Sequence, residues 1–208
     1  MPSALLIDLD GTLIDSEPWY KRTEVATLNG FGVPIKLEEM GEFTGLTLRT
    51  WLQRINSQYD KALTMEQFLE DYRPQMEEHV RTNVQMFSDT MPFLERAKGV
   101  PSILVTSSMK WYVDVVLERF PEIGEAVQGV VCEADVKIGK PDPEPYLMAS
   151  ERLGVDPGLA WVIEDAKNGV TSGIAAGCHV IGVDREGHGT LGMAHQVVSD
   201  LSGLLVRA

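Results

Sequence analysis

Five short apolar segments, rich in β-branched residues, recur along this chain of 208 residues and constrain its fold. Their length and their lack of apolar–polar alternation are typical of strands buried on both faces of a sheet. They cover residues 4–8, 102–106, 129–132, 160–165 and 179–184. Between the later strands lie segments long enough for helices, at 109–120, 143–153 and 167–176. Repeated alternation of strand and helix predicts an α/β fold with a doubly wound, Rossmann-like parallel sheet.

The segment 16–88 breaks this alternation and has a helical pattern instead. Thr64 and Gln67 form a capping box, in which each side chain satisfies a backbone N–H at the start of a helix. Apolar residues then follow at helical spacing, namely Met65, Phe68, Leu69, Tyr72 and Met76. We expect Pro74 to kink or end this helix, because proline lacks the N–H that a helix interior needs.

Two earlier segments, 17–30 and 46–58, also have a helical pattern. An all-helical domain therefore interrupts the sheet after its first strand. We predict a core domain formed by residues 1–15 and 89–208, with the helical domain at 16–88 inserted as a cap.

Composition excludes several classes of function. The formal net charge is −13 and Lys and Arg are not clustered, which argues against a nucleic-acid partner because phosphate backbones are held by clustered cations. No run of about 18 apolar residues occurs, and the N-terminus has neither a basic region nor a cleavage site, so we predict a cytoplasmic protein without a membrane partner. Cys132 and Cys178 provide no disulfide framework and are expected to be buried, inert thiols. The oligomeric state is not predicted.

The stretch IDLDGTLID, at residues 7–15, places two aspartates directly after the first strand. Burying one carboxylate at the end of a strand is unfavourable, and a second carboxylate beside it adds like-charge repulsion. The pair Asp8 and Asp10 therefore predicts that a positive charge, absent from this stretch, lies beside them.

Three further polar groups follow later strands. Thr106 and Ser107 end the second strand, and Lys140 lies in the stretch IGKPDPEPY. Glu164 and Asp165 end the fourth strand. Each group alone is more often a helix cap, a solvated charge or a loop. Their joint occurrence at one edge of a parallel sheet predicts an active site.

These groups are chemically complementary. Asp8, Asp10 and Asp165 can offer oxygen ligands to Mg²⁺, which takes few carboxylates, several waters and a substrate phosphate oxygen. One aspartate can attack phosphorus to form an aspartyl-phosphate, while another acts as general acid and then as general base. Lys140 and the Thr106 hydroxyl can neutralise the charge of the phosphoryl oxygens.

The stretches DLDGTLIDSE, VTSSMKW, GKPDPEPY and VIEDAKNGV resemble the four successive motifs of the haloacid dehalogenase-like (HAD) hydrolase superfamily, in its subgroup with a helical cap after the first motif. The resemblance implies that Asp8 is the nucleophile, and that Asp10 is the general acid and base and a metal ligand through its backbone carbonyl. It further implies a phosphoryl-binding hydroxyl at Thr106, a cation at Lys140 that orients Asp8 and the phosphoryl group, and a metal site at Asp165 with support from Glu164. The cofactor that follows is Mg²⁺, and the partner is a small phosphorylated metabolite.

Within the family, the second aspartate decides between reaction types. The dehalogenases lack this residue, whereas Asp10 is present, so dehalogenation is not expected. Relatives of β-phosphoglucomutase carry a histidine shortly after the first motif, where this chain has Tyr20. The stretch FTGLTLRTWL resembles the substrate-facing cap loop of phosphosugar phosphatases, with Arg49 toward the substrate. We therefore predict a phosphosugar phosphatase with Ser107, Arg49 and Tyr20 as substrate-binding residues.

Two alternatives remain open at this point. One is a sugar-phosphate mutase of the β-phosphoglucomutase type. The other is a non-catalytic binding protein that keeps the fold, and its expected signature would be the loss of Asp8, Asp10, Lys140 or Asp165, all of which are present.

Overall fold

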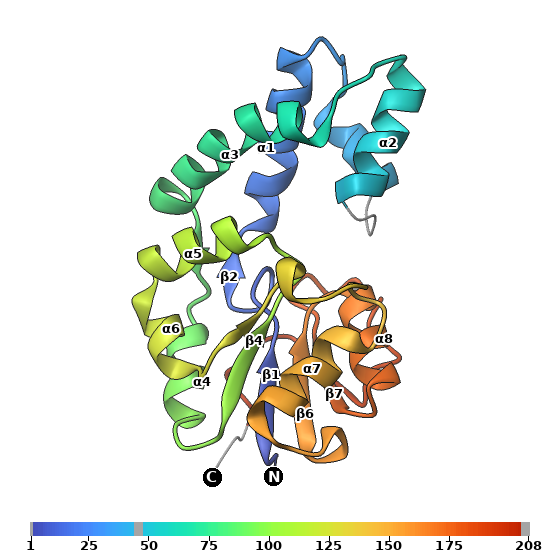
Figure 1. Cartoon of the computed structure of the whole chain (residues 1–208). Coiled ribbons are helices and arrows are strands. Elements are labelled where there is room, and N and C mark those ends of the chain that lie inside the picture. Colours follow the sequence, from blue (N-terminus) through green and yellow to red (C-terminus); the bar gives the residue numbers. More distant parts are fainter. Residues whose placement is uncertain (1, 44–47, 205–208) are drawn as a thin grey trace. The chain divides into compact units, whose positions relative to one another are not determined.

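A computed structural model describes residues 2–43 and 48–204, with the backbone alone at 41–43, 49 and 50. The chain divides into two compact units (Figure 1). We call Met1–Asp15 together with Gln85–Ala208 the core unit, and Ser16–Val84 the helical unit.

The core unit is built on a six-stranded sheet in which every pairing is parallel. Its strands are β1 (Ala4–Ile7), β4 (Ser102–Val105), β5 (Val130–Val131), β6 (Ala160–Glu164), β7 (His179–Val183) and β8 (Gln196–Val198). Their order across the sheet is β5-β4-β1-β6-β7-β8. The strand β8 was not predicted, because its three residues are mostly exposed and form no apolar run. The predicted fold class is otherwise confirmed.

The order of the strands places a topological switch point at β1. From β1 the chain adds β4 and β5 on one side, and then returns to add β6, β7 and β8 on the other side. In open parallel sheets, ligands bind outside the carboxyl ends of the strands at such a point. The ends of β4, β1 and β6 are therefore where a site is expected.

Helices connect these strands and cover the sheet (Figure 1). They are α4 (Thr90–Arg96), α5 (Lys110–Arg119), α6 (Pro121–Ala126), α7 (Glu144–Leu153) and α8 (Lys167–Ala175), with short 3₁₀ turns at Glu133–Asp135 and Pro157–Leu159. Helices α7 and α8 pack against each other and against the strands. Because parallel crossovers are right-handed, the reversal of direction after β5 puts these two helices on the opposite face from α4, α5 and α6.

A short antiparallel pair marks the two points where the chain leaves and re-enters the core unit. It joins β2 (Ile14–Asp15) to β3 (Gln85–Met86). Since β3 pairs with a strand of the core unit, the helical unit ends at Val84, whereas the predicted cap domain extended to residue 88.

The helical unit contains α1 (Glu17–Gly30), a 3₁₀ segment (Leu37–Phe43), α2 (Leu48–Tyr59) and α3 (Met65–Thr82). The capping box of Thr64 and Gln67 is confirmed at the start of α3. Helix α3 continues through Pro74 to Thr82, so the expectation of a helix end there is wrong, whereas the expected kink stays a prediction. Apolar residues on both sides of the proline pack on one face, and their burial offsets the hydrogen bond that the proline removes. These residues are Phe68, Tyr72, Met76 and Val80.

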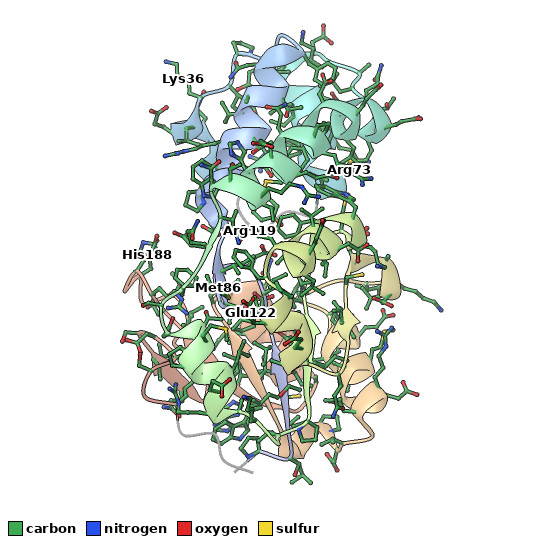
Figure 2. The ribbon with its side chains drawn as sticks, turned by 90° about the vertical axis from the view of Figure 1, so that its left-hand side faces the viewer. Lys36, Arg73, Met86, Arg119, Glu122 and His188 are labelled. Carbon is green, nitrogen blue, oxygen red and sulfur yellow. The ribbon has the colours of Figure 1, made fainter. Side chains whose placement is uncertain are left out.

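Aromatic side chains fill the interior of the helical unit. The ring of Phe68 lies 5.1 Å from that of Trp51, edge to face, and 5.1 Å from that of Tyr72, stacked. All three side chains are buried. Charged side chains such as Lys36 and Arg73 are exposed on the surface of this unit (Figure 2). Among the described residues, no helix has the length and apolar character needed to cross a membrane.

Candidate active site

Three neighbouring strands bring the predicted catalytic groups to one edge of the sheet. Asp8 follows β1, and its backbone N–H donates to the Ile163 carbonyl of β6 at 2.9 Å. Thr106 follows β4, and its N–H donates to the Val131 carbonyl of β5 at 2.9 Å. Glu164 is the last residue of β6. The sheet register therefore fixes these backbone positions at the switch point.

Lys140 is the central cation of this edge. Its Nζ donates to Asp8 Oδ1 at 2.7 Å, to Glu164 Oε1 at 2.7 Å and to the Val105 carbonyl at 2.8 Å. Its side chain is only 5% exposed, so these contacts are shielded from water. Burial by itself would lower the pKa of Lys140, but the carboxylates of Asp8 and Glu164 outweigh burial and raise it well above its usual value. Lys140 therefore stays charged.

For the carboxyl group of Asp8, the effect of burial on the pKa outweighs the attraction of Lys140. Burial is the largest influence and raises the pKa of Asp8 to about 8, although Lys140 lowers it and the nearby carboxyl groups of Glu164 and Asp10 raise it further. The single positive charge of Lys140 does not balance the carboxyl groups of Asp8, Asp10 and Glu164. An additional positive charge beside Asp8 would restore its ionised form.

Asp165 lies against the turn that follows Asp10. Gly11 has φ +76°, and a Cβ there would collide with the Asp165 carboxylate. Thr12 donates from Oγ1 to Asp165 Oδ1 at 3.3 Å. Glycine is therefore required at position 11 both for the backbone conformation and for the approach of Asp165.

Asp8, Glu164 and Asp165 each offer an oxygen atom, and these atoms all lie within 4.8 Å of one another. We call these three residues the acidic cluster. Hard oxygen donors at this spacing fit a divalent cation such as Mg²⁺. The unbalanced charge and the raised pKa of Asp8 favour the same ion.

Both carboxylate oxygens of Glu164 accept hydrogen bonds from neighbouring groups of the protein. Oε1 accepts from Lys140 and, at 3.1 Å, from the Tyr146 hydroxyl, and Oε2 accepts from the Ala166 N–H at 2.8 Å. A Cβ at Gly169 would collide with this carboxylate. These contacts fix Glu164 as the buried counterion of Lys140, and its role toward a metal stays a prediction.

Asp10 directs its carboxylate toward the loop after β4. Oδ1 accepts from the Tyr112 hydroxyl at 2.7 Å, and Oδ2 accepts from Ser108 Oγ at 2.7 Å and from Thr106 Oγ1 at 3.4 Å. Ser107, the predicted substrate-binding residue, is exposed. The substrate-binding role of Ser107 stays a prediction, and its neighbour Ser108 is one of the residues whose hydroxyls contact Asp10.

Four residues of this site were not singled out from the sequence: Thr12, Ser108, Tyr112 and Tyr146. Tyr146 ends the quoted stretch GKPDPEPY and Ser108 lies within VTSSMKW, so both belonged to recognised motifs. Tyr112 lies on α5, and its side chain is about 1% exposed. A buried tyrosine requires a partner for its hydroxyl, and that requirement was the available signal.

The two predicted substrate-binding residues outside the core lie in the helical unit. Tyr20 is on α1 and Arg49 is on α2. The side chain of Arg49 lies outside the described residues. Both roles stay predictions.

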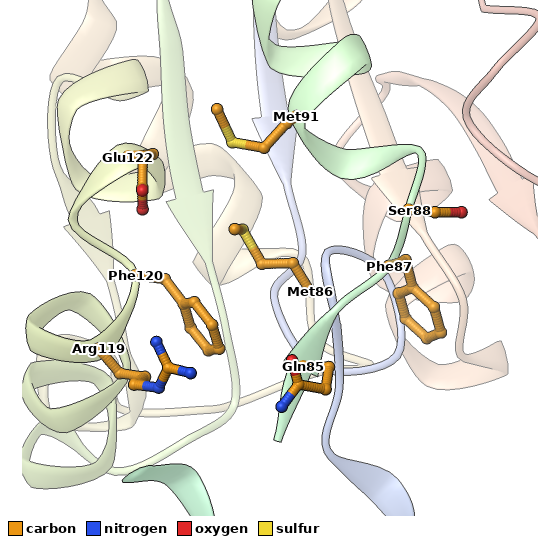
Figure 3. A pocket seen from close by; sticks show the side chains of 8 residues that line it. All are labelled: Gln85, Met86, Phe87, Ser88, Met91, Arg119, Phe120 and Glu122. Carbon is orange, nitrogen blue, oxygen red and sulfur yellow. The ribbon is translucent and has the colours of Figure 1, made fainter. Parts of the chain in front are cut away.

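A hollow of about 360 Å³ in the core unit is separate from the acidic cluster (Figure 3). Its walls include the apolar side chains of Met86, Met91 and Phe120, with Arg119 and Glu122 also at its lining. None of its lining residues belongs to the acidic cluster. The buried charges, and not this hollow, define the candidate site.

Comparison with known proteins agrees with this geometry. Residues 5–183 match the family described as haloacid dehalogenase-like hydrolase. Hexitol phosphatase A of Escherichia coli (strain K12) is 34% identical over 182 residues, which cover 86% of this chain and 82% of that protein. Pyrophosphatase PpaX of Bacillus velezensis is 31% identical over 182 residues, covering 87% and 82%.

A solved structure is also similar over almost the whole chain. The crystal structure of a putative β-phosphoglucomutase from Thermotoga maritima has a TM-score of 0.76 and 26% identity, and the match covers 96% of this chain and 94% of that one. A parallel α/β core with an acidic, lysine-bridged edge at the switch point is consistent with this family. The chain belongs to the haloacid dehalogenase-like hydrolases. The predicted enzyme class, a phosphatase of this family, is confirmed.

Proposed function

We propose that this protein hydrolyses small phosphomonoesters, phosphosugars in particular, with Mg²⁺ and through an aspartyl-phosphate on Asp8. The observation that carries the proposal is the buried Lys140, which bonds both Asp8 and Glu164 next to Asp165. A buried lysine shared by two acids keeps a nucleophilic carboxylate oriented and leaves room for a second cation.

In the first half of the reaction, a carboxylate oxygen of Asp8 attacks phosphorus and the bond from phosphorus to the ester oxygen breaks. Asp10 donates a proton to the leaving alkoxide. The hydroxyl of Thr106 and the ammonium group of Lys140 bind the phosphoryl oxygens while their charge is redistributed.

In the second half, Asp10 accepts a proton from a water molecule, whose oxygen attacks the phosphorus of the aspartyl-phosphate. The bond from phosphorus to Asp8 breaks, inorganic phosphate leaves and the carboxylate is restored. Tyr112 and Ser108 bond the carboxylate of Asp10 and hold it at the edge of the sheet.

Asp8 and Asp165 would hold Mg²⁺, together with the backbone carbonyl of Asp10, and Glu164 would support them. When bound, Mg²⁺ supplies positive charge that favours ionised Asp8 and draws a phosphate oxygen toward it. The helical unit would act as a cap that selects the substrate, with Tyr20 and Arg49 as contacts.

The preference for phosphosugars is supported by the named relatives. Hexitol phosphatase A is 34% identical, and other relatives are a probable pseudouridine-5′-phosphatase and phosphoglycolate phosphatases. These names share a small phosphorylated metabolite as the substrate. We therefore place this chain with phosphatases of that substrate class.

The proposal is tested with a panel of phosphorylated metabolites, assayed for inorganic phosphate with Mg²⁺ and with chelator. We expect a phosphosugar to be the best substrate, no turnover in chelator, recovery with Mg²⁺, and little support from the larger Ca²⁺. Full activity in chelator would contradict the metal role.

Mutase activity is the second candidate, because the similar Thermotoga maritima structure is that of a putative β-phosphoglucomutase. Tyr20, at the position where mutase relatives carry histidine, favours hydrolysis. With a hexose 1-phosphate, a hydrolase releases phosphate in step with substrate loss. Accumulation of hexose 6-phosphate that depends on a bisphosphate primer would establish the mutase instead.

A further inference from the structure

Arg185, in the segment after β7, joins parts of the core unit that are far apart in the sequence. Its Nε donates to the Gly11 carbonyl at 3.2 Å and its Nη2 donates to the Thr12 carbonyl at 2.7 Å. Its Nη1 pairs with Asp89 Oδ2 at 3.1 Å, and its guanidinium carbon lies 3.7 Å from the centre of the Phe87 ring. The side chain is 17% exposed. Each of the three guanidinium nitrogens therefore donates a hydrogen bond.

The two carbonyls that Arg185 holds belong to the turn after Asp10, whose other side faces Asp165. Gly11 leaves no room for a Cβ against the Asp165 carboxylate, and Thr12 Oγ1 donates to it. A small displacement of this turn would press Gly11 onto Asp165 or break the bond from Thr12. The position of Asp165 is therefore linked to the carbonyls that Arg185 binds.

The other end of this linkage is firmly anchored. Asp89 is buried, and its Oδ2 also accepts from the Leu201 N–H at 2.6 Å. The segment around Asp89 is bonded to the same turn region, since the Phe87 N–H and the Thr90 hydroxyl both donate to the Leu13 carbonyl, at 3.1 and 2.6 Å. Arg185 is therefore held between a fixed carboxylate and the turn.

From these contacts we propose that Arg185 is a positioning residue for the metal site. It holds the turn of Gly11 and Thr12 against Asp165 and thereby sets the affinity of the acidic cluster for Mg²⁺. The inference rests on the proposed function only in taking Mg²⁺ as the ligand.

The decisive variant is Arg185→Lys. It keeps the positive charge but replaces the planar guanidinium group, with its three nitrogens, by a single ammonium group. The matched control is Arg152→Lys. Arg152 also belongs to the core unit, and it donates to the Val130 carbonyl at 2.6 Å and to Asp135 Oδ1 at 2.6 Å. These contacts do not involve the turn.

Three quantities are measured on the full chain. Hydrogen exchange of the peptide covering residues 9–15, without metal, reports the turn. Calorimetric titration with Mg²⁺ in the presence of inorganic phosphate reports affinity without turnover. Phosphate release at increasing Mg²⁺ reports the concentration needed for half-maximal activity.

We expect Arg185→Lys to speed exchange of the turn peptide and to raise the dissociation constant for Mg²⁺ about ten-fold, as loss of outer-sphere support typically does. The Mg²⁺ concentration for half-maximal activity should rise by the same factor, with activity largely recovered at saturating Mg²⁺. Arg152→Lys should change none of these quantities more than about two-fold.

The outcomes separate this inference from the proposed function. Equal Mg²⁺ dissociation constants in Arg185→Lys and wild type would overturn the inference and leave the phosphatase proposal standing. A wild-type protein that binds Mg²⁺ but hydrolyses nothing would overturn the phosphatase proposal alone. Wild-type protein that binds no Mg²⁺ would overturn the metal role in both, and unchanged exchange of the turn peptide would then remove the positioning role as well.

Discussion

The core unit and the helical unit bury different kinds of side chain. In the described part of the core unit, the carboxylates of Asp8, Asp89 and Glu164 are buried, and each one pairs with a lysine or an arginine. In the described part of the helical unit, the buried polar residues are Ser16, Thr23 and Thr27, which carry uncharged hydroxyls, and the other buried side chains are aliphatic or aromatic.

This difference has a physical consequence. A buried ion pair contributes little net stability, because the desolvation of both charges opposes their attraction. An apolar interior stabilises in proportion to the area that it removes from water. The charges of the core unit are therefore best explained by chemistry, and the aromatic interior of the helical unit by stability.

The largest expected effect is on catalysis and comes from Asp8→Asn. An amide cannot attack phosphorus, so kcat should fall by at least about 10⁴-fold, while the protein stays folded. Phosphate release with Mg²⁺ measures this effect, and circular dichroism confirms folding. A purified variant that retains a near-normal rate would refute covalent catalysis by Asp8.

The second prediction contrasts the two interiors directly. Lys140→Met leaves Asp8 and Glu164 buried without their cation and should lower the free energy of unfolding by about 3–5 kcal/mol at pH 8 in chelator. Phe68→Ala should lower it by about 3–5 kcal/mol through the cavity it creates. Urea unfolding at pH 5 and pH 8 distinguishes the causes, because only the Lys140 effect should shrink at pH 5, where Asp8 is protonated.

The control for this contrast is Lys110→Met. Lys110 is an exposed lysine paired with Asp114 one helical turn away, at 2.6 Å. Its loss should leave the free energy of unfolding almost unchanged, because a solvent-exposed ion pair contributes little to stability. An equal effect of Lys110→Met and Lys140→Met would show that burial of the charge is unimportant.

The third prediction concerns specificity and the helical unit. If Arg49 contacts a polar part of the substrate, Arg49→Ala removes a charged hydrogen bond worth about 1.5–3 kcal/mol and should lower kcat/KM for the best substrate roughly ten- to a hundred-fold. A simple aryl phosphate offers no such group, and its hydrolysis should be nearly unchanged. Equal losses on both substrates, or none on either, would leave Arg49 without a role in specificity.

The last prediction is the pH dependence of stability that Asp8 causes, which is a gradual change and not the loss of a single contact. Its pKa is about 8 in the folded protein and 3.8 ordinarily, so between these values the folded state holds a proton that the unfolded state has lost. Stability of the metal-free protein should therefore fall as pH rises toward 8. The asparagine of Asp8→Asn has no proton to lose. The free energy of unfolding of this variant, minus that of wild type, should therefore grow by up to about 1 kcal/mol per pH unit between pH 5 and 8. Urea unfolding in chelator measures this difference. A constant difference would contradict the raised pKa.

The parallel sheet could be predicted because buried strands produce continuous apolar runs. The same rule missed β8, whose residues are mostly exposed. A separate local rule, based on the missing N–H of proline, predicted a kink or an end of the helix at Pro74. The helix does not end there, because that rule does not include the burial of Phe68 and Met76 on either side. Local patterns therefore predicted the elements better than their ends.

The sequence by itself determined the fold class, the enzyme family and the polar groups at the carboxyl ends of the strands. These features are encoded in local runs and ordered motifs, which can be read without knowing distant contacts.

Only the tertiary structure decided which atoms meet. It brought Ser108 to Asp10 and Tyr146 to Glu164, and it linked Arg185 to Gly11 across 174 positions. Side chains that protrude from different strands and loops meet because sheet order and helix packing place them together, and sequence spacing carries no record of that geometry.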